Sequence, residues 1–426
     1  MLDIKFIREN PDIVRLAIQN KNTEPIDLDE VIRLHDERKV LKQDIDQLNQ
    51  EKNQAATARD IDRGRQIKEE LQVVTAKHSE VEKALVALLL KIPNIPSVDT
   101  PIGPDESANK VLRVVGEKPS FSFTPKPHWE LGKTLGIIDT EKASEVSGAR
   151  FTYLKGDAAV LQFALFDLAR KILMDQHTLE TIATAAGSKA TITPFIPVVP
   201  PVMMRSAVMN RMARLEPIDE RYFFEKDDMV FIGSAEHTLG PLHMDEVLPE
   251  EKLPLRYFAF TLAFRREAGS YGKDTRGLIR MHQFDKLEME TFVSPEDGYE
   301  EQDFLVAVQE YFLQLLKLPY QVVAISTGDM GAPDHRQFDM ETWMPGQDVY
   351  RETHTADYMG GYQARRLNTR SKRSDGKSET VHMNDATLVA MGRTIAAILE
   401  NYQQEDGSVR VPTALQPYFG KDIITA

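Results

Sequence analysis

Apolar residues recur at alternating spacings of three and four along two neighbouring segments near the N-terminus. The first carries Val31, Leu34, Leu41, Ile45, Leu48 and Ala55, and the second carries Ile67, Leu71, Val74, His78, Val81, Leu85, Leu88 and Ile92. This heptad pattern predicts two long helices that share an apolar seam, in which we interpret His78 as a packing residue. Because only residues 57–64 separate the segments, the helices should be antiparallel neighbours, each about 40–45 Å long. A pair this thin has no globular core, so we expect it to project as an arm.

The pattern changes at Pro93 and Pro96, where proline ends the second helix. A segment rich in Pro, Asp and Ser follows as far as Gly116 and indicates a linker. Beyond it, helical spacing at 158–186, 298–317 and 387–404 mixes with strand-like alternation at 195–199, 255–264, 284–292, 321–326 and 338–343. The basic segment 370–377 predicts a hairpin turn or loop. We expect two domains: residues 1–105 as arm and linker, and residues 106–426 as a body of helices and strands.

Composition narrows the class of protein. Of the 426 residues, 42% are apolar and 28% are charged, which is ordinary for a globular protein. No apolar run approaches the roughly 18–20 residues of a membrane span, and the N-terminus lacks the apolar core of a signal peptide. The chain has no cysteine, which excludes disulfides and thiolate metal sites. We therefore expect a cytoplasmic protein without a membrane partner.

Net charge argues against a general nucleic-acid binder. The formal charge is −14, whereas such binders are usually basic. A local basic patch can still contact phosphate, because screening confines these contacts to about 8–10 Å. The residues Arg59, Arg63, Arg65 and Lys68 gather at the predicted tip of the arm. The tip is thus the place where a phosphate backbone is expected to bind.

A loop rich in Gly and Arg joins the predicted strands 255–264 and 284–292. It contains Arg265, Arg266, Arg276, Arg280, Gly269, Gly272 and Gly277. A guanidinium fork binds phosphate oxygens bidentately, so the loop suits a triphosphate. The chain has no Walker loop, no Gly-x-Ser-x-Gly elbow and no His-Glu-x-x-His motif. This removes the common competing types of enzyme.

The same loop resembles motif 2 of the class II aminoacyl-tRNA synthetases, in the form found in seryl-tRNA synthetases. The matching runs are Phe264-Arg265-Arg266-Glu267-Ala268-Gly269, Asp274-Thr275-Arg276-Gly277-Leu278-Ile279-Arg280 and His282-Gln283-Phe284-Asp285-Lys286-Leu287-Glu288. Met391-Gly392-Arg393 resembles motif 3, and residues 193–201 resemble motif 1 with Pro201 as its proline. The resemblance implies an α+β fold: an antiparallel sheet with flanking helices, plus an N-terminal antiparallel coiled-coil arm.

The resemblance also assigns roles in binding ATP. Arg265 and Arg393 are the catalytic candidates: Arg265 for the α-phosphate and the attacking carboxylate, Arg393 for the adenine face and the γ-phosphate. Phe284 should stack on the adenine, Glu267 and Met281 should contact it, and Arg280 should hold the outer phosphates. The predicted ATP-binding set is Arg265, Arg266, Glu267, Arg280, Met281, Phe284, Glu352, Thr353, His354, Thr355 and Arg393. No separate role is assigned to His354.

The segment Tyr350–Thr355 resembles the family's metal segment. Glu352 and the Thr355 hydroxyl would ligate Mg²⁺, which prefers oxygen ligands and is shared with the phosphates of ATP; no zinc is expected. The family usually has Ser at position 355 and a Cys-Ser-Asn-like run where this chain has Ala356-Asp357-Tyr358. The hydroxyl is retained, so metal binding is expected to survive.

The implied serine site is Ser234, Ala235, Glu236, Glu288 and Thr387. Ser234 replaces the usual Thr of a Thr-Ala-Glu loop, Glu288 should pair with the substrate ammonium, and Thr387 should meet its hydroxyl. Residues 383–387 (Met-Asn-Asp-Ala-Thr) differ from the usual Asn-Gly-Ser or Asn-Asn-Thr. A site that hydrogen-bonds the substrate hydroxyl in this way rejects alanine, because the missing hydroxyl leaves polar groups of the site unpaired.

Together these motifs imply a serine–tRNA ligase that forms seryl-adenylate from L-serine and ATP and charges tRNA(Ser), with tRNA(Sec) as a further acceptor. The arm would grip the long variable arm of the tRNA, and motif 1 would build a homodimer. Two alternatives stay open: an amino acid ligase acting on a carrier protein, and a non-catalytic paralogue that binds tRNA.

Overall fold

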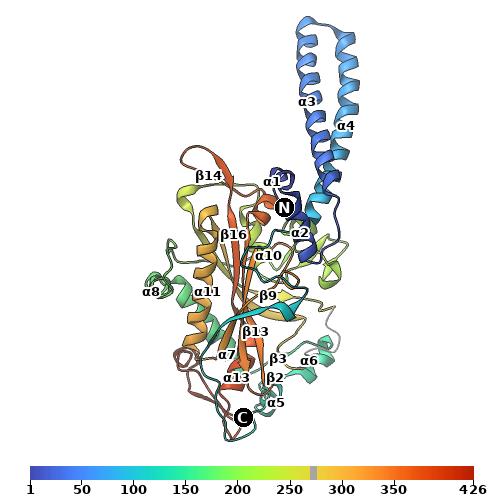
Figure 1. Cartoon of the computed structure of the whole chain (residues 1–426). Helices are drawn as coiled ribbons and strands as arrows, with labels where there is room; N and C mark the ends of the chain where they lie inside the picture. The colour runs from blue at the N-terminus through green and yellow to red at the C-terminus, as the bar shows by residue number, and fades with distance from the viewer. Residues whose placement is uncertain (269–275) are drawn as a thin grey trace. The chain divides into compact units, whose positions relative to one another are not determined.

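The computed structural model describes residues 1–268 and 276–426, which form two compact units, Met1–Ile95 and Pro96–Ala426. The first unit consists of α1 (Ile4–Glu9), α2 (Pro11–Asn20), α3 (Leu28–Ala58) and α4 (Ile61–Lys91). The long pair α3 and α4 runs side by side and antiparallel (Figure 1). The predicted coiled-coil arm is therefore confirmed, whereas α1 and α2 were not predicted.

The turn of the arm is shorter than predicted. Arg59 adopts a left-handed conformation with φ of 57° and ends α3, and the carboxylate of Asp60 accepts a hydrogen bond from the Arg63 N–H and caps α4. Only these two residues separate the helices, because a left-handed residue and an N-cap reverse the chain in the least space. The seam holds buried Leu28, Val31, Leu34, Leu41, Ala55, Ile67, Val81, Leu85 and Leu89. His78 is half-buried on α4, as a packing residue should be.

The second unit is built on an eight-stranded sheet. Its strand order is β1 (Lys110–Val115), β11 (Tyr320–Ala324), β12 (Arg336–Met344), β13 (Val349–Gly360), β16 (His382–Ala390), β10 (Gln283–Val293), β9 (Leu255–Phe264) and β4 (Ile196–Val198). Neighbours are antiparallel except β4, which runs parallel to β9 at the edge. The predicted antiparallel sheet is confirmed.

Helices cover this sheet and close the core. The main ones are α5 (His128–Thr134), α7 (Asp157–Met174), α8 (Gln176–Ala186), α11 (Gly298–Leu315), α12 (Tyr362–Leu367) and α13 (Met391–Asn401). Helices α11 and α13 pack against the central strands (Figure 1). The predicted helix 158–186 is divided at Asp175, whose carboxylate caps α8. The prediction of a helix from residue 387 was wrong, because Thr387–Ala390 finish β16 before α13 begins.

Short elements complete the unit. The helices are α6 (Thr140–Ser147), α9 (Ser206–Arg211), α10 (Glu236–Leu239) and α14 (Gln416–Phe419). The strands are β2 (Ile138–Asp139), β3 (Tyr153–Leu154), β5 (Met203–Arg205), β6 (Phe223–Phe224), β7 (Met229–Phe231), β8 (Val247–Pro249), β14 (Arg370–Lys372), β15 (Ser378–Thr380), β17 (Val409–Arg410) and β18 (Ile423–Ile424). Strands β14 and β15 form the hairpin predicted at 370–377. Within the described ranges, no helix is both long and apolar enough to cross a membrane.

Candidate active site

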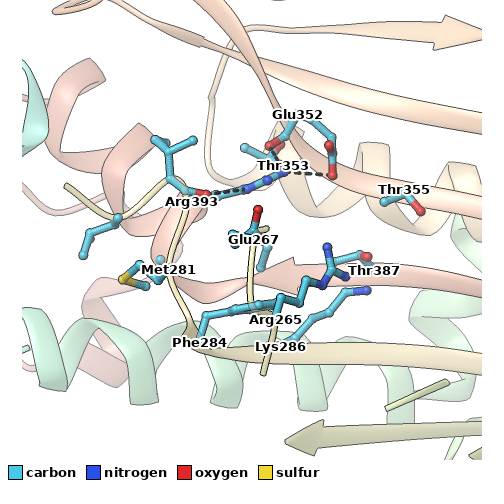
Figure 2. A pocket seen from close by; sticks show the side chains of 14 residues that line it. Arg265, Glu267, Met281, Phe284, Lys286, Glu352, Thr353, Thr355, Thr387 and Arg393 are labelled. Carbon is cyan, nitrogen blue, oxygen red and sulfur yellow. Dashed lines mark hydrogen bonds and ion pairs between the residues drawn. The ribbon is translucent and has the colours of Figure 1, made fainter. Parts of the chain in front are cut away.

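One cavity on the face of the central sheet collects most of the predicted ATP-binding residues. It is lined by strands β10, β13 and β16, by the loop between β9 and β10, and by the first turn of α13. The predicted residues around it are Arg265, Glu267, Met281, Phe284, Glu352, Thr353, Thr355, Thr387 and Arg393. Figure 2 shows Arg393 with Glu352 on one side of the cavity and Phe284, Arg265 and Lys286 along the other. Cationic groups and one aromatic ring therefore face a common space.

Arg265 follows β9 directly and is fixed at both ends. Its Nε donates to the Gly233 carbonyl at 3.1 Å, and its guanidinium lies 5.3 Å from the centre of the Phe284 ring. Residue 284 is placed by the β9–β10 register, which pairs it with Ala263. The cation–π contact and the hydrogen bond hold the fork at the cavity wall, where it suits an anionic group.

Glu267 and Arg280 pair with each other. The Arg280 Nη1 donates to the Glu267 carboxylate at 2.6 Å. Glu267 has a positive φ of 53°, which turns the chain at the start of the loop. The predicted motif residues Gly269, Gly272, Asp274 and Thr275 lie outside the described residues, and Arg266 is exposed outside the cavity lining.

The far end of the same loop rests on a buried histidine that the sequence did not single out. The Leu278 N–H donates to His128 Nε2 at 2.9 Å, and His128 Nδ1 lies 2.7 Å from the Glu400 carboxylate. Gly277 has a φ of +75°, and a Cβ there would lie 2.1 Å from His128 Nε2. His128 and Glu400 thus fix the backbone beside the cavity, and only glycine fits against them.

Arg393 enters the cavity because strand β16 runs straight into α13. Its Nη1 donates to the carbonyl and to the carboxylate of Glu352, each at 2.8 Å, and its Nε donates to the Ile279 carbonyl at 3.2 Å. Gly392 allows the approach, since a Cβ there would lie 3.0 Å from the Leu278 carbonyl oxygen. Burial alone would raise the pKa of Glu352, but the guanidiniums of Arg393 and Arg265 lower it, so the carboxylate stays ionised.

A β-bulge determines which side chains of strand β13 face the cavity. Met340 pairs with His354 and Glu341 with Glu352, which leaves Thr353 as the extra residue. The extra residue shifts the alternation, so Glu352 and Thr355 both line the cavity. His354 is fully buried and does not line it; its Nδ1 lies 2.8 Å from the Thr353 hydroxyl, and burial lowers its pKa to about 3.

The predicted serine-site residues are divided: Thr387 lines the first cavity, Glu288 lines neither, and a second cavity holds the rest of the lining. The second cavity shares Arg265, Glu352 and Thr355 with the first. Ser234 and Glu236 line it, while Ala235 is buried in a separate apolar cluster. The Thr387 hydroxyl donates to Glu288 at 3.4 Å, and Lys286 pairs with Glu288 at 2.5 Å. Burial alone would raise the pKa of Glu236, but Arg214 lowers it to about 2, with Arg214 Nε at 2.8 Å.

Comparison with known proteins agrees with this geometry. The model of the seryl-tRNA synthetase N-terminal domain matches residues 1–96, and that of the tRNA synthetase class II core domain (G, H, P, S and T) matches residues 222–402. A serine–tRNA ligase of Thermodesulfovibrio yellowstonii is 40% identical, over 100% of both chains. The chain belongs to the seryl-tRNA synthetase family. As such it is a class II aminoacyl-tRNA synthetase, a serine–tRNA ligase, and the predicted family, fold and type of enzyme are confirmed.

Solved seryl-tRNA synthetases have the same fold along the whole chain. The enzyme of Pyrococcus horikoshii, crystallised with ATP, matches with a TM-score of 0.86 and 33% identity, covering 100% of this chain and 99% of its own. The enzyme of Naegleria fowleri, in complex with AMP, matches with a TM-score of 0.83 and 29% identity over the same shares. Both related seryl-tRNA synthetases were therefore solved with an adenine nucleotide.

Sequence reasoning missed several residues of this synthetase site. Lys286 lines both cavities and Arg214 lines the second, while His128 and Glu400 act behind the loop. Lys286 lay inside the recognised motif and could have been found there. His128 gave no signal, because its partners Leu278 and Glu400 are far away in the sequence.

Proposed function

We propose that this synthetase forms seryl-adenylate from L-serine and ATP in these cavities and then charges tRNA(Ser), with tRNA(Sec) as a second acceptor. The observation that carries the proposal is the convergence of Arg265 and Phe284, at the two ends of the β9–β10 loop, with the distant Arg393 on one cavity. Activation of serine by in-line attack at phosphorus needs positioned cations and an oriented nucleotide rather than a nucleophilic side chain.

In the first step a serine carboxylate oxygen attacks the α-phosphorus, the bond to the β-phosphate oxygen breaks, and pyrophosphate leaves. Arg265 would neutralise the charge that builds on the α-phosphoryl oxygens, because its fork is already fixed by Gly233 and Phe284. In the second step a ribose hydroxyl of the tRNA end attacks the acyl carbon, and AMP leaves. Arg265 remains beside the departing phosphate.

The adenine would lie between the opposite walls of the cavity, with Phe284 on one side and Arg393 on the other (Figure 2). An aromatic ring and a guanidinium both stack well on a purine. Arg280 would turn from Glu267 to the outer phosphates, which frees Glu267 for the adenine end. Met281 and Thr353 would complete the walls, and Arg266 would approach from the exposed side.

Mg²⁺ would be held by Glu352 and Thr355 together with phosphate oxygens. The donors fit this ion, because they are oxygens that the bulge turns to the same cavity. When bound, Mg²⁺ would supply positive charge to the phosphates. Arg393 would then leave the Glu352 carboxylate and contact the nucleotide.

For serine, Glu288 would pair with the α-ammonium and Thr387 would meet the hydroxyl, with Ser234 and Glu236 completing the wall. Their support is proximity: Thr387 and Glu288 are opposite residues on β16 and β10. Ala235 would act only by shaping the turn between Ser234 and Glu236.

The first unit would serve tRNA binding. Arg59, Arg65 and Lys68 are exposed at the arm's tip, while Arg63 pairs with Glu51 and Glu70. Exposed basic side chains contact phosphates without reading sequence. We propose residues 1–105 as the tRNA-binding arm and linker, and residues 106–426 as the catalytic domain.

The enzyme would act as a cytoplasmic homodimer joined through the motif 1 segment. That segment contains edge strand β4, in which Ile196 is 48% exposed, and Val199 directly after the strand is 98% exposed. Exposed apolar residues at a sheet edge favour a protein partner.

Serine-dependent ATP–pyrophosphate exchange, followed by charging of tRNA(Ser) transcripts, tests this function. Exchange without charging would favour a ligase for a carrier protein, and loss of both would favour the non-catalytic paralogue.

A further inference from the structure

Two aspartates that line the serine-site cavity lie directly opposite each other on neighbouring strands. Asp357 on β13 pairs with Asp385 on β16, and Asp385 pairs with Glu290 on β10. Both aspartates line the cavity, with 8% and 3% of their surface exposed. Like charges directly opposite on neighbouring strands destabilise a sheet, so the ionised form of this pair would lower the stability of the fold.

This row comes directly after the proposed serine-binding row. Thr387 and Glu288 form one cross-strand pair, and Asp385 and Glu290 form the pair two residues further along both strands. Residues two apart share a face and lie about 6.8 Å apart along a strand. The side chain of a bound amino acid whose α-ammonium meets Glu288 can therefore extend toward Asp385.

Both aspartates have hydrogen-bonding capacity to spare. Among the described residues, neither Asp357 Oδ1 nor Asp385 Oδ1 has a hydrogen-bond partner, although both atoms are buried. The Asp357 Oδ2 accepts a hydrogen bond from the Thr355 hydroxyl at 3.3 Å. Buried polar atoms are nearly always paired, so two unpaired oxygens at a cavity wall indicate a donor that arrives with a ligand.

Two cations that line this cavity are paired with other carboxylates. Arg214 pairs with Glu236 at 2.8 Å and with Asp334 at 3.3 Å. Lys286 pairs with Glu288 at 2.5 Å. Glu236, Asp334, Asp357 and Asp385 line the cavity together with Arg214, so four carboxyl groups lie around this guanidinium. Burial raises the pKa of Asp357 and Asp385, and a cation bound between them would favour their ionised form. A cationic group is favoured over a neutral one in such a place.

We propose that Asp357 and Asp385 read the side chain of the amino acid, and that they allow this synthetase to activate 2,3-diaminopropionate, in which an ammonium replaces the serine hydroxyl. The inference rests on the proposed function and names a second substrate of the same site. Both aspartates lie in the segments where this chain departs from the family pattern.

The reaction matches that of serine. The carboxylate oxygen of 2,3-diaminopropionate attacks the α-phosphorus of ATP and forms the mixed anhydride. The bond to the β-phosphate oxygen breaks, and pyrophosphate leaves. The side-chain ammonium keeps its proton and stays between the two carboxylates.

The test is ATP–pyrophosphate exchange with the full chain, using serine, 2,3-diaminopropionate and alanine. We expect kcat/KM for diaminopropionate within about tenfold of serine, and for alanine at least about 100-fold lower, since alanine leaves the polar groups unpaired. Absence of diaminopropionate exchange, or its inhibition of serine exchange without turnover, overturns the proposal. Absence of serine exchange in the same preparation would instead refute the proposed function.

The variant Asp385→Asn assigns the effect to this residue. It keeps the shape and removes the charge, so the diaminopropionate-to-serine ratio should fall at least about tenfold. Glu290→Gln is the matched control, because Glu290 belongs to the same row but does not line the cavity; it should keep the ratio. If Asp385→Asn does not fold, Asp357→Asn takes its place. An unchanged ratio in the folded variant overturns the assignment.

Discussion

The arm and the body are stabilised over very different distances along the chain. In the arm, α3 and α4 meet across a turn of two residues, so the contacts of the seam spread outward from that turn. In the body, β1 at 110–115 pairs with β11 at 320–324, and β10 at 283–293 lies between β9 and β16. The arm can form from local pattern alone, whereas the active site exists only when distant strands reach the correct register.

The largest expected effect is a loss of adenylate formation without a change in the fold. Arg265→Ala should lower serine-dependent pyrophosphate exchange by about 1,000-fold or more, because the fork that faces the α-phosphate is lost. Circular dichroism and the arm should be unchanged, since this side chain bonds only to the rim of the cavity. Arg370→Ala, an exposed arginine on β14, is the control. Undiminished exchange in Arg265→Ala would refute the assigned role.

Removal of the arm should impair tRNA charging and spare ATP–pyrophosphate exchange. Replacing residues 30–90 by a short Gly-Ser linker should leave exchange within about twofold and lower tRNA charging by about 100-fold, because the phosphate contacts are lost. The double variant Arg59→Glu and Arg65→Glu tests the tip without shortening the arm, and its defect should shrink at low salt. If the shortened enzyme charged tRNA at the full rate, the arm would not be the part of the enzyme that binds the tRNA.

Acid should weaken the body through His237. Burial lowers the pKa of this histidine to about 3, and its Nδ1 accepts the Gly233 N–H at 3.1 Å. In the unfolded chain histidine titrates near pH 6.5, so the unfolded state binds the extra proton below that pH. This contribution to stability is complete above about pH 6.5 and falls toward pH 3, by about 2 kcal/mol between pH 6.5 and 5.

Urea unfolding at pH 7.5, 6.5 and 5 measures this slope. His237→Asn keeps an acceptor for Gly233 and should remove about 2 kcal/mol of the pH dependence. Glu236 titrates lower, with a pKa of about 2, and so stays outside this window. Equal slopes in the variant and the natural enzyme would contradict the assignment.

The smallest effect concerns the support behind the loop. His128→Gln should raise KM for ATP by about fivefold to tenfold, because Leu278 and Glu400 lose their shared partner, while kcat changes less. KM for serine should be unaffected in the same assay. A variant with an unchanged KM for ATP would mean that the loop holds its position without this histidine.

Sequence patterns within single elements predicted many of the helices and strands, whereas contacts between residues far apart in the sequence were not predicted. The heptads gave both arm helices, and alternation gave β9 at 255–264 as the structure has it. The helix predicted from residue 387 failed because β16 and α13 are continuous, and apolar residues in a buried strand and a buried helix look alike. The motif residues converge, but His354 lies away from the cavity, since the bulge at Thr353 depends on pairing with β12. His128 was not found, as its role follows from contacts across the fold.

The bulge at Thr353 makes the spacing of this strand, and not only its residues, a requirement of the enzyme. Without the bulge, strict alternation would put Glu352 and Thr355, which are three residues apart, on opposite faces even though both remained in the chain. In a related gene, a one-codon insertion between these two residues would therefore turn one of them away from the cavity, although every residue of the site would still be present.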